Sequence, residues 1–165
     1  MPNFEKIEAT LPLGAFSTFD MEAIYPALIK SSKNDVYLEV GVDKGKSLAF
    51  ARRYFKGDVF GIDVRDNPEI KGTNFFQMES NEAVKIWNHP IKVLFIDGDH
   101  SYKGVKDDWD NFSPFVIKGG WVFFHDAEGP VGSLVQAVTY LDGVSLCTRK
   151  MRGCHITCSR CRKKI

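Results

Sequence analysis

The feature that most constrains the fold is a regular alternation of short apolar runs with longer amphipathic segments along the 165 residues. Short apolar runs are typical of strands buried on both faces, and amphipathic segments between them are typical of helices that connect parallel strands. The alternation predicts an α/β fold with a doubly wound, mostly parallel sheet. The expected strands are VYLEVG (36–41), DVFGID (58–63), TNFFQM (73–78), IKVLFID (91–97) and GGWVFFHD (119–126).

Helices are expected before, between and after these strands. A first helix should begin at Ser17 or Thr18, because both residue types cap helix N-termini. The length of the chain fits a single domain, with an N-terminal segment and helix over 1–33 and an α/β core over 34–165. The other expected helices cover residues 44–55, 81–88, 101–117 and 130–142.

The C-terminal segment combines two further predicted strands with four cysteines. VSLCTRK and GCHITCSR are separated by residues suited to a tight turn, so we expect an antiparallel hairpin. A zinc site is the alternative, but on a strand Cys154 and Cys158 share one face while Cys161 and His155 point to the other. This geometry favours structural thiols. The basic residues nearby are expected to protect an edge strand from pairing with other chains. The four cysteines are Cys147, Cys154, Cys158 and Cys161.

Two glycines follow the first predicted strand, in the sequence EVGVDKGKS. Gly41 allows a tight turn and Gly45 lies where the next helix begins, so a ligand can approach the backbone and the free N–H groups of that helix. The GxxxG spacing differs from the GxGxxG of dinucleotide sites. Asp63 ends the second strand, where a carboxylate can accept hydrogen bonds from ribose hydroxyls or can cap the following turn. The sequence therefore predicts a nucleoside cofactor site.

Acidic and histidine side chains follow two neighbouring predicted strands. Asp97, Asp99 and His100 come after one strand, and His125 and Asp126 come after the next. Because the carboxyl ends of parallel strands meet at one edge of a sheet, these side chains should lie together. Clustered carboxylates repel each other unless a cation intervenes, which favours a divalent metal. The alternative is structural: Asp99 caps the following helix and His125 hydrogen-bonds locally.

The stretch LFIDGDHSYKGVKDDWDNFSPFVIKGGWVFFHD resembles the class I S-adenosylmethionine-dependent methyltransferases, and among them the sugar O-methyltransferases of antibiotic biosynthesis. The resemblance implies a Rossmann-like, seven-stranded sheet that ends in an antiparallel hairpin. It implies S-adenosylmethionine as cofactor and a small hydroxylated substrate. Glu39 would then face the ammonium group of the cofactor, and Val64, Glu79 and Ser80 would surround the adenine. The cofactor-binding residues implied in this way are Glu39, Gly41, Gly45, Ser47, Asp63, Val64, Glu79, Ser80 and Asp97.

The same resemblance assigns a metal, and the chemistry of the neighbouring residues suggests a base. Asp97 and Asp126 would be ligands of Mg²⁺ or another divalent metal, with His125 as a candidate third ligand. Metal-dependent relatives often have a carboxylate at this third position. A nitrogen ligand there favours a transition metal over Mg²⁺. The alternative is that the site holds no metal. Asp99 or His100 would take the proton of the substrate hydroxyl, since histidines titrate close to neutral pH.

Composition argues against several classes of partner. A net charge of +1 offers no basic excess for nucleic acid, and no stretch approaches the roughly 20 apolar residues of a membrane span. The start of the chain lacks the pattern of a signal peptide, so a cytoplasmic protein is expected. A non-catalytic cofactor-binding protein and an NAD-binding oxidoreductase domain remain alternatives, although GxxxG and the hairpin disfavour the second. No insertion is long enough to form a lid, so the pocket is either open or completed by a second subunit of a homo-oligomer.

Overall fold

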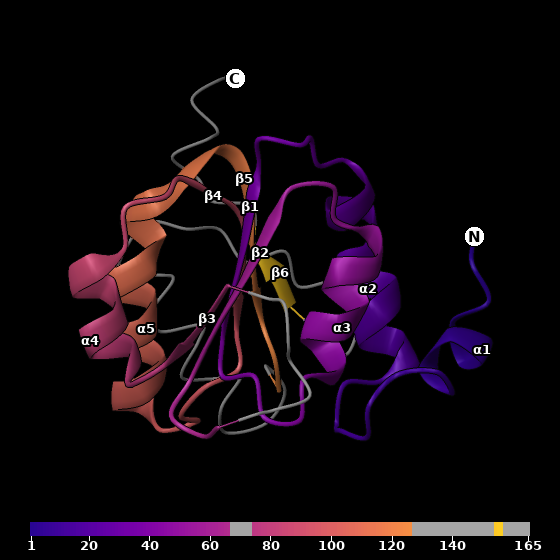
Figure 1. Ribbon diagram of the computed structural model, residues 1–165, viewed down its shortest axis with the longest axis horizontal. Coiled ribbons are helices and arrows are strands. Elements are labelled where there is room, and N and C mark those ends of the chain that lie inside the picture. Colours follow the sequence, from indigo (N-terminus) through magenta and orange to yellow (C-terminus); the bar gives the residue numbers. More distant parts are fainter. Residues whose placement is uncertain (67–73, 127–153, 157–165) are drawn as a thin grey trace.

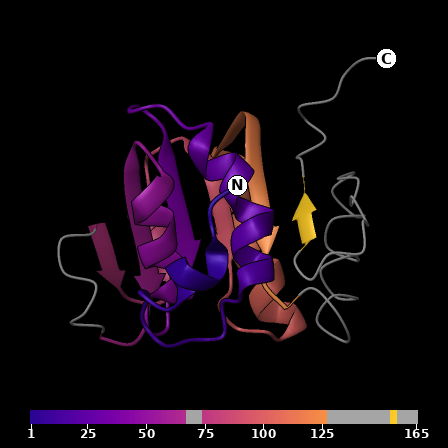
Figure 2. The same ribbon diagram turned by 90° about the vertical axis from the view of Figure 1, so that its right-hand side faces the viewer.

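A computed structural model describes residues 1–66, 74–126 and 154–156, and shows a sheet between two layers of helices (Figure 1). The strand order is β3-β2-β1-β4-β5-β6, with β3 and β6 at opposite edges (Figure 2). The first five strands along the chain run parallel, and β6 pairs antiparallel with β5. The strands are β1 Val36–Val40, β2 Asp58–Asp63, β3 Asn74–Gln77, β4 Ile91–Ile96, β5 Val116–Phe124 and β6 Cys154–Ile156.

The order of the strands reverses between β1 and β4. From β1 the chain builds outward to β2 and β3, returns to place β4 on the other side of β1, and continues to β5. Ligands of doubly wound sheets bind outside the carboxyl ends of the strands at such a reversal. The predicted doubly wound, mostly parallel sheet is confirmed for these strands, and it directs attention to the ends of β1 and β4.

Each face of the sheet has its own helices and its own core. Helices α1 to α3 cover one face, where they pack against side chains such as Tyr37 and Phe95. Helices α4 and α5 cover the other face, where Leu38 and Leu94 point. Alternate residues of one strand thus serve opposite cores, which explains why β1 is apolar almost throughout. The helices are α1 Phe4–Glu8, α2 Thr18–Ile29, α3 Lys46–Tyr54, α4 Ser80–Ile86 and α5 Tyr102–Phe112.

The helix predicted over 101–117 is shorter than expected. It ends at Phe112, a 3-10 turn follows over Ser113–Phe115, and β5 begins at Val116 instead of residue 119. Pro114 explains the early end, because proline has no N–H to donate to the helix hydrogen-bond pattern. The apolar pattern of residues 112–117 was therefore split wrongly between helix and strand.

The N-terminal segment contains a short helix that the sequence did not predict. Asn3 caps α1 by accepting the backbone N–H of Lys6 at 3.0 Å, and Phe4 and Ile7 are buried against α2 and α3. Ser17 precedes α2, as predicted, and forms a capping box with Asp20.

The C-terminal prediction can be compared only in part. Residues of β6 pair with the end of β5, with Cys154 opposite Phe124. The helix expected over 130–142, the strand VSLCTRK, the turn of the hairpin and three of the cysteines lie outside the described residues, and so does any seventh strand. Among the described residues, no helix is long and apolar enough to cross a membrane.

Candidate functional site

A cavity of about 500 Å³ opens at the carboxyl ends of β1, β2 and β4, where the strand order reverses. Seven of the residues predicted from the sequence to form a site line it, and they come from the end of β2, from the loops after these strands and from the start of α4. Of the other predicted residues, Gly45 ends the loop after β1, and Glu39 and Ser47 lie behind that loop. His100, His125 and Asp126 lie beside Asp97. The seven that line the cavity are Gly41, Asp63, Val64, Glu79, Ser80, Asp97 and Asp99.

The loop after β1 depends on its glycines. Gly41 and Gly45 have φ angles of 84° and 81°, in the left-handed region that favours glycine. A Cβ atom on Gly41 would lie 2.1 Å from the carbonyl oxygen of Asp97, so any other residue would push the loop away from the end of β4. The glycine loop and the Asp97 loop are therefore in direct backbone contact.

Asp63 holds this loop in place. Its Oδ2 atom accepts the backbone N–H groups of Val42 and Asp43, each at 2.8 Å, and its Oδ1 atom accepts the N–H of Arg65 at 2.9 Å. Burial opposes ionisation, but these N–H groups and the Arg65 guanidinium hold the pKa of Asp63 below its ordinary value. The structural alternative, in which Asp63 fixes a turn, is therefore observed. The ribose contact stays a prediction, with the carboxylate at the wall of the cavity.

Glu39 lies on the α3 side of the sheet. Its carboxyl is fully buried and accepts hydrogen bonds from the hydroxyl of Ser47 at 2.5 Å and from that of Tyr37 at 2.7 Å. Burial raises the pKa of Glu39 to about 8, against the effect of the two hydroxyls. The side chain ties β1 to the first turn of α3, behind the glycine loop. Its predicted contact with the cofactor remains untested.

The cavity continues past Asp63 toward Val64, Glu79 and Ser80, the residues predicted to surround adenine. Glu79 and Ser80 lie together because α4 begins there, with Glu79 as its N-cap. Asp108 of α5 also lines the cavity, and it was missed in the sequence. The available signal was an acid at a core position of an amphipathic helix, within the buried set Val105, Asp108, Trp109 and Phe112.

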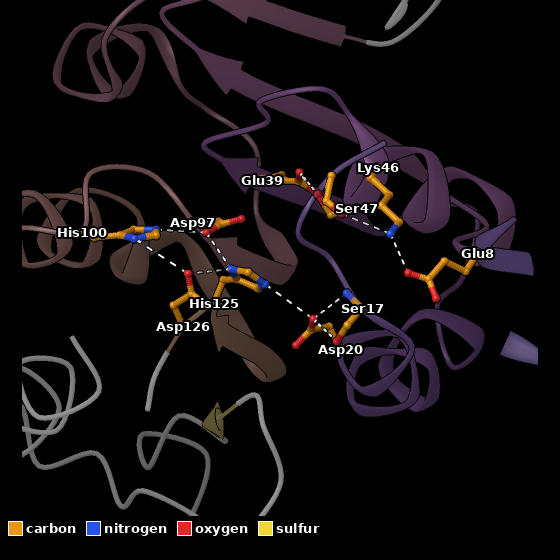
Figure 3. Close-up of polar contacts among 11 residues, drawn as sticks. Glu8, Ser17, Asp20, Glu39, Lys46, Ser47, Asp97, His100, His125 and Asp126 are labelled. Atoms are coloured by element: carbon orange, nitrogen blue, oxygen red, sulfur yellow. Dashed lines mark hydrogen bonds and ion pairs between the residues drawn. The ribbon is translucent and has the colours of Figure 1, made fainter. Parts of the chain in front are cut away.

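Figure 3 shows the second part of the site, a chain of carboxylates and imidazoles beside Asp97. Asp97 Oδ1 lies 3.2 Å from His100 Nε2 and 3.0 Å from His125 Nδ1. Asp126 Oδ2 lies 3.9 Å from His100 Nδ1 and 3.5 Å from His125 Nδ1. Strands β4 and β5 are neighbours, and this adjacency brings together the four residues, as the sequence predicted.

One ligand atom from each of Asp97, His100 and Asp126 lies within 4.8 Å of the others. Two carboxylates and one imidazole are a suitable donor set for a divalent metal. Among the described residues, this is the group whose geometry fits an ion, and it contains His100 in the place of the predicted His125.

His125 is buried between two carboxylates. Its Nε2 atom lies 3.5 Å from Asp20 Oδ2 on α2, and Asp97 is on its other side. Burial disfavours the charged imidazole, but Asp20 and Asp97 outweigh it and raise the pKa of His125 to about 10. Nδ1 lies near Asp97 yet makes no hydrogen bond of good geometry. His125 lies beside the three residues whose ligand atoms come within 4.8 Å of one another, and its role as a metal ligand stays a prediction.

Asp99 and Ser101 have a structural role in the loop after β4. Ser101 caps α5 by accepting the N–H of Gly104 at 3.0 Å. Asp99 accepts both the backbone N–H and the hydroxyl of Ser101, at 2.9 Å and 2.6 Å, and these hydrogen bonds lower its pKa. A carboxylate of lowered pKa is a weak base, so of the two predicted bases the geometry leaves His100 as the better placed.

Comparison with known proteins adds a family to this geometry. A family model for a methyltransferase domain matches residues 38–127. Among curated proteins, uncharacterized protein R132 of Acanthamoeba polyphaga mimivirus is 28% identical over 57% of this chain and 52% of its own length. This chain therefore spans about half the length of that relative.

Solved structures show the same fold. MycE, a methyltransferase from the mycinamycin biosynthetic pathway solved with Mg, SAH and mycinamycin VI, has a TM-score of 0.74 and 17% identity, over 95% of this chain and 54% of MycE. CalS11, a TDP-rhamnose 3'-O-methyltransferase of calicheamicin biosynthesis, has a TM-score of 0.60 and 16% identity, over 82% of this chain and 76% of CalS11. Since the family model covers more than half of the chain, the protein belongs to this methyltransferase domain family and has the class I methyltransferase fold.

Proposed function

We propose that this protein transfers a methyl group from S-adenosylmethionine to a hydroxyl group of a small hydroxylated molecule, such as a sugar or a related natural product. The observation that carries the proposal is the junction at Asp97, where the cavity at the end of β1 meets the cluster of Asp97, His100 and Asp126. A methyl donor in the cavity and a hydroxyl at the cluster would be neighbours. Two neighbours in fold, MycE and CalS11, act in natural-product pathways and support this substrate class.

The residues of the cavity would bind and orient the methyl donor. S-adenosylmethionine supplies an electrophilic methyl group on a sulfonium sulfur. Asp63 already holds the glycine loop by two backbone N–H groups, so the wall of the cavity is preorganised. Val64 is 52% exposed and offers an apolar surface to a base. Most of the rate gain in such a reaction comes from aligning the two reactants.

The cluster would prepare the acceptor hydroxyl. A divalent metal, when bound by Asp97, Asp126 and His100, would hold the hydroxyl and lower its pKa. Without a metal, the exposed imidazole of His100 is the base within reach, because Asp99 is occupied by Ser101. His125 lies on the buried side of this cluster, with its Nδ1 atom 3.0 Å from Asp97 Oδ1.

Two alternative functions can be distinguished from methyl transfer by experiment. An NAD-binding oxidoreductase is disfavoured by the GxxxG loop and by the antiparallel β6. A cofactor-binding protein that does not catalyse and acts with a partner is the other alternative. Methyl transfer by the isolated chain would argue against both alternatives.

The first experiment is calorimetric titration of the protein with S-adenosylhomocysteine, with and without Mg²⁺, and with NAD as the comparison ligand. We expect micromolar binding of S-adenosylhomocysteine and none of NAD. Asp63→Ala should abolish binding, because it removes the ribose acceptor and releases the loop. Asp58→Ala, at the exposed opposite end of β2, is the matched control. Binding of NAD without S-adenosylhomocysteine would overturn the proposal.

A further inference from the structure

The buried face of α5 contains one acid. Val105, Trp109 and Phe112 pack into the core, and Asp108 is 4% exposed on the same face. An ionised carboxylate in such a position is unfavourable unless hydrogen-bond donors or cations compensate for the lost water. The position therefore needs an explanation beyond the packing of the helix.

Asp108 is buried from bulk solvent but reaches the cavity. It lines the cavity together with Ser80 and Gly98, and the Ser80 hydroxyl hydrogen-bonds to it. A Cβ atom at position 98 would lie 2.9 Å from Asp108 Oδ2. The glycine at the end of β4 thus leaves open a side of the carboxylate that any other residue would cover.

The Asp108 carboxylate has room for a further hydrogen-bond donor. Burial and the carboxylates of Asp107, Asp99 and Glu79 raise the pKa of Asp108 to about 6, against the hydrogen bond from Ser80. An ionised carboxylate has about four acceptor positions, and one hydroxyl uses only one of them. An uncharged ligand that donates N–H groups would stabilise the ionised form without bringing another negative charge.

We propose that Asp108 recognises the exocyclic amino group of adenine and so selects an adenine nucleoside for the cavity. This inference rests on the proposed function and adds a residue that reads the base. Asp63, where the proposed function places the ribose, lines one part of the cavity, and Asp108 adjoins Ser80 where the base is expected. A 6-oxo base presents an acceptor at the same place, which a carboxylate repels and cannot bind.

The experiment compares S-adenosylhomocysteine with its 6-oxo analogue, S-inosylhomocysteine, by calorimetry. The wild type should bind the adenine compound at least roughly tenfold more tightly, as expected for loss of one hydrogen bond to a charged group. Asp108→Asn has nearly the same shape and carries an amide that can donate to a 6-oxo group. It should weaken the adenine compound, strengthen the 6-oxo compound and reduce the preference at least about tenfold. Asp108→Ser, which lacks the carboxylate and adds no bulk, replaces Asp108→Asn if that variant does not fold.

Asp110→Asn is the matched control, because Asp110 lies on the same helix, outside the cavity, and pairs with Lys106. It should keep the wild-type preference. A wild type that binds neither compound would overturn the proposed function. A wild type that binds S-adenosylhomocysteine but shows no preference, or an Asp108→Asn variant that weakens both compounds equally, would overturn the role of Asp108 alone.

Discussion

The carboxyl of Glu39 lies at the end of β1 with no exposed surface, between the hydroxyls of Tyr37 and Ser47. Burial raises its pKa to about 8 from an ordinary value of 4.5. Below pH 4.5 both the folded and the unfolded protein carry the proton. Between pH 4.5 and about pH 8 the unfolded chain releases the Glu39 proton and the folded protein keeps it. The free energy of unfolding must therefore fall as the pH rises through this range.

Glu39→Gln should remove this dependence. An amide of the same shape carries no ionisable proton, so the variant should gain stability over the wild type as the pH rises from about 4.5 to about 8. The full difference is on the order of 5 kcal/mol, at about 1.36 kcal/mol for each unit of pKa shift. Urea unfolding at several pH values measures it. Parallel curves for the two proteins would show that Glu39 has an ordinary pKa.

Asp97 is the residue at which the cavity and the cluster meet. Asp97→Asn should reduce methyl transfer at least about a hundredfold and should weaken Mn²⁺ binding, because a neutral amide is a poor metal ligand. Turnover assays and electron paramagnetic resonance of Mn²⁺ are the measurements, with Asp110→Asn as the control. Full activity in Asp97→Asn would refute the assignment of this cluster.

Residues at strand ends were predictable and their partners were not. Gly41, Asp63 and Asp97 could be placed at one edge of the sheet because parallel strands bring their carboxyl ends together. The partners of His125 and Asp108 depend on which helices pack against which strands, and sequence spacing does not contain that information. Asp20 of α2, for example, lies 3.5 Å from His125, which follows β5.

At the scale of elements, Asp20 connects the start of α2 to the end of β5. The same Oδ2 atom accepts the backbone N–H and the hydroxyl of Ser17, at 2.7 Å and 2.6 Å, and faces His125 Nε2. Ser17 was predicted from the sequence as a candidate helix cap. The role of Asp20 as a counter-charge for a buried imidazole needed the tertiary structure.

Asp20→Asn should lower the pKa of His125 and destabilise the protein. The raised pKa of His125 contributes stability that is fully present below its ordinary value of 6.5 and is lost as the pH rises through about 10. The loss of stability in the variant should therefore be largest below pH 6.5 and should shrink toward pH 10. NMR titration of the imidazole and denaturant unfolding measure the two effects. Glu22→Gln, exposed on the same helix, is the control, and equal His125 titration in both variants would contradict the prediction.

The boundaries of elements were predicted best where the local signal was strong. β2 runs over Asp58–Asp63, as predicted, because its apolar run is bounded by polar residues. The start of β5 was misplaced because Phe112, Phe115 and Val116 fit either a helix or a strand, and only Pro114 marks the change.

At the scale of the whole molecule, the N-terminal helix α1 is attached to α3, the helix that follows the glycine loop. Lys46 Nζ lies 2.6 Å from Glu8 Oε1 and donates to the carbonyl of Gly14 at 3.2 Å. Phe4 packs against Phe50 of α3. The alternation of strands and helices predicted the fold class, but this attachment lies outside that pattern.

Glu8→Gln should loosen α1 and leave the sheet intact. Glu8 is about one third exposed, so the expected loss is small, about 1 kcal/mol or less. It should appear as faster hydrogen exchange and proteolysis confined to the first 16 residues. Glu5→Gln, exposed on the same helix, should behave like the wild type. Unchanged exchange in Glu8→Gln would show that apolar packing alone holds the helix.

The loop after β1 has a consequence for the speed of binding. Asp63 holds the N–H groups of Val42 and Asp43, and Gly41 rests on the backbone of Asp97, so the loop has its shape before any ligand arrives. A site that needs no rearrangement is filled in one step. In stopped-flow mixing, the observed rate should then rise linearly with the nucleoside concentration, without a plateau, and affinity would be set mainly by how slowly the ligand leaves.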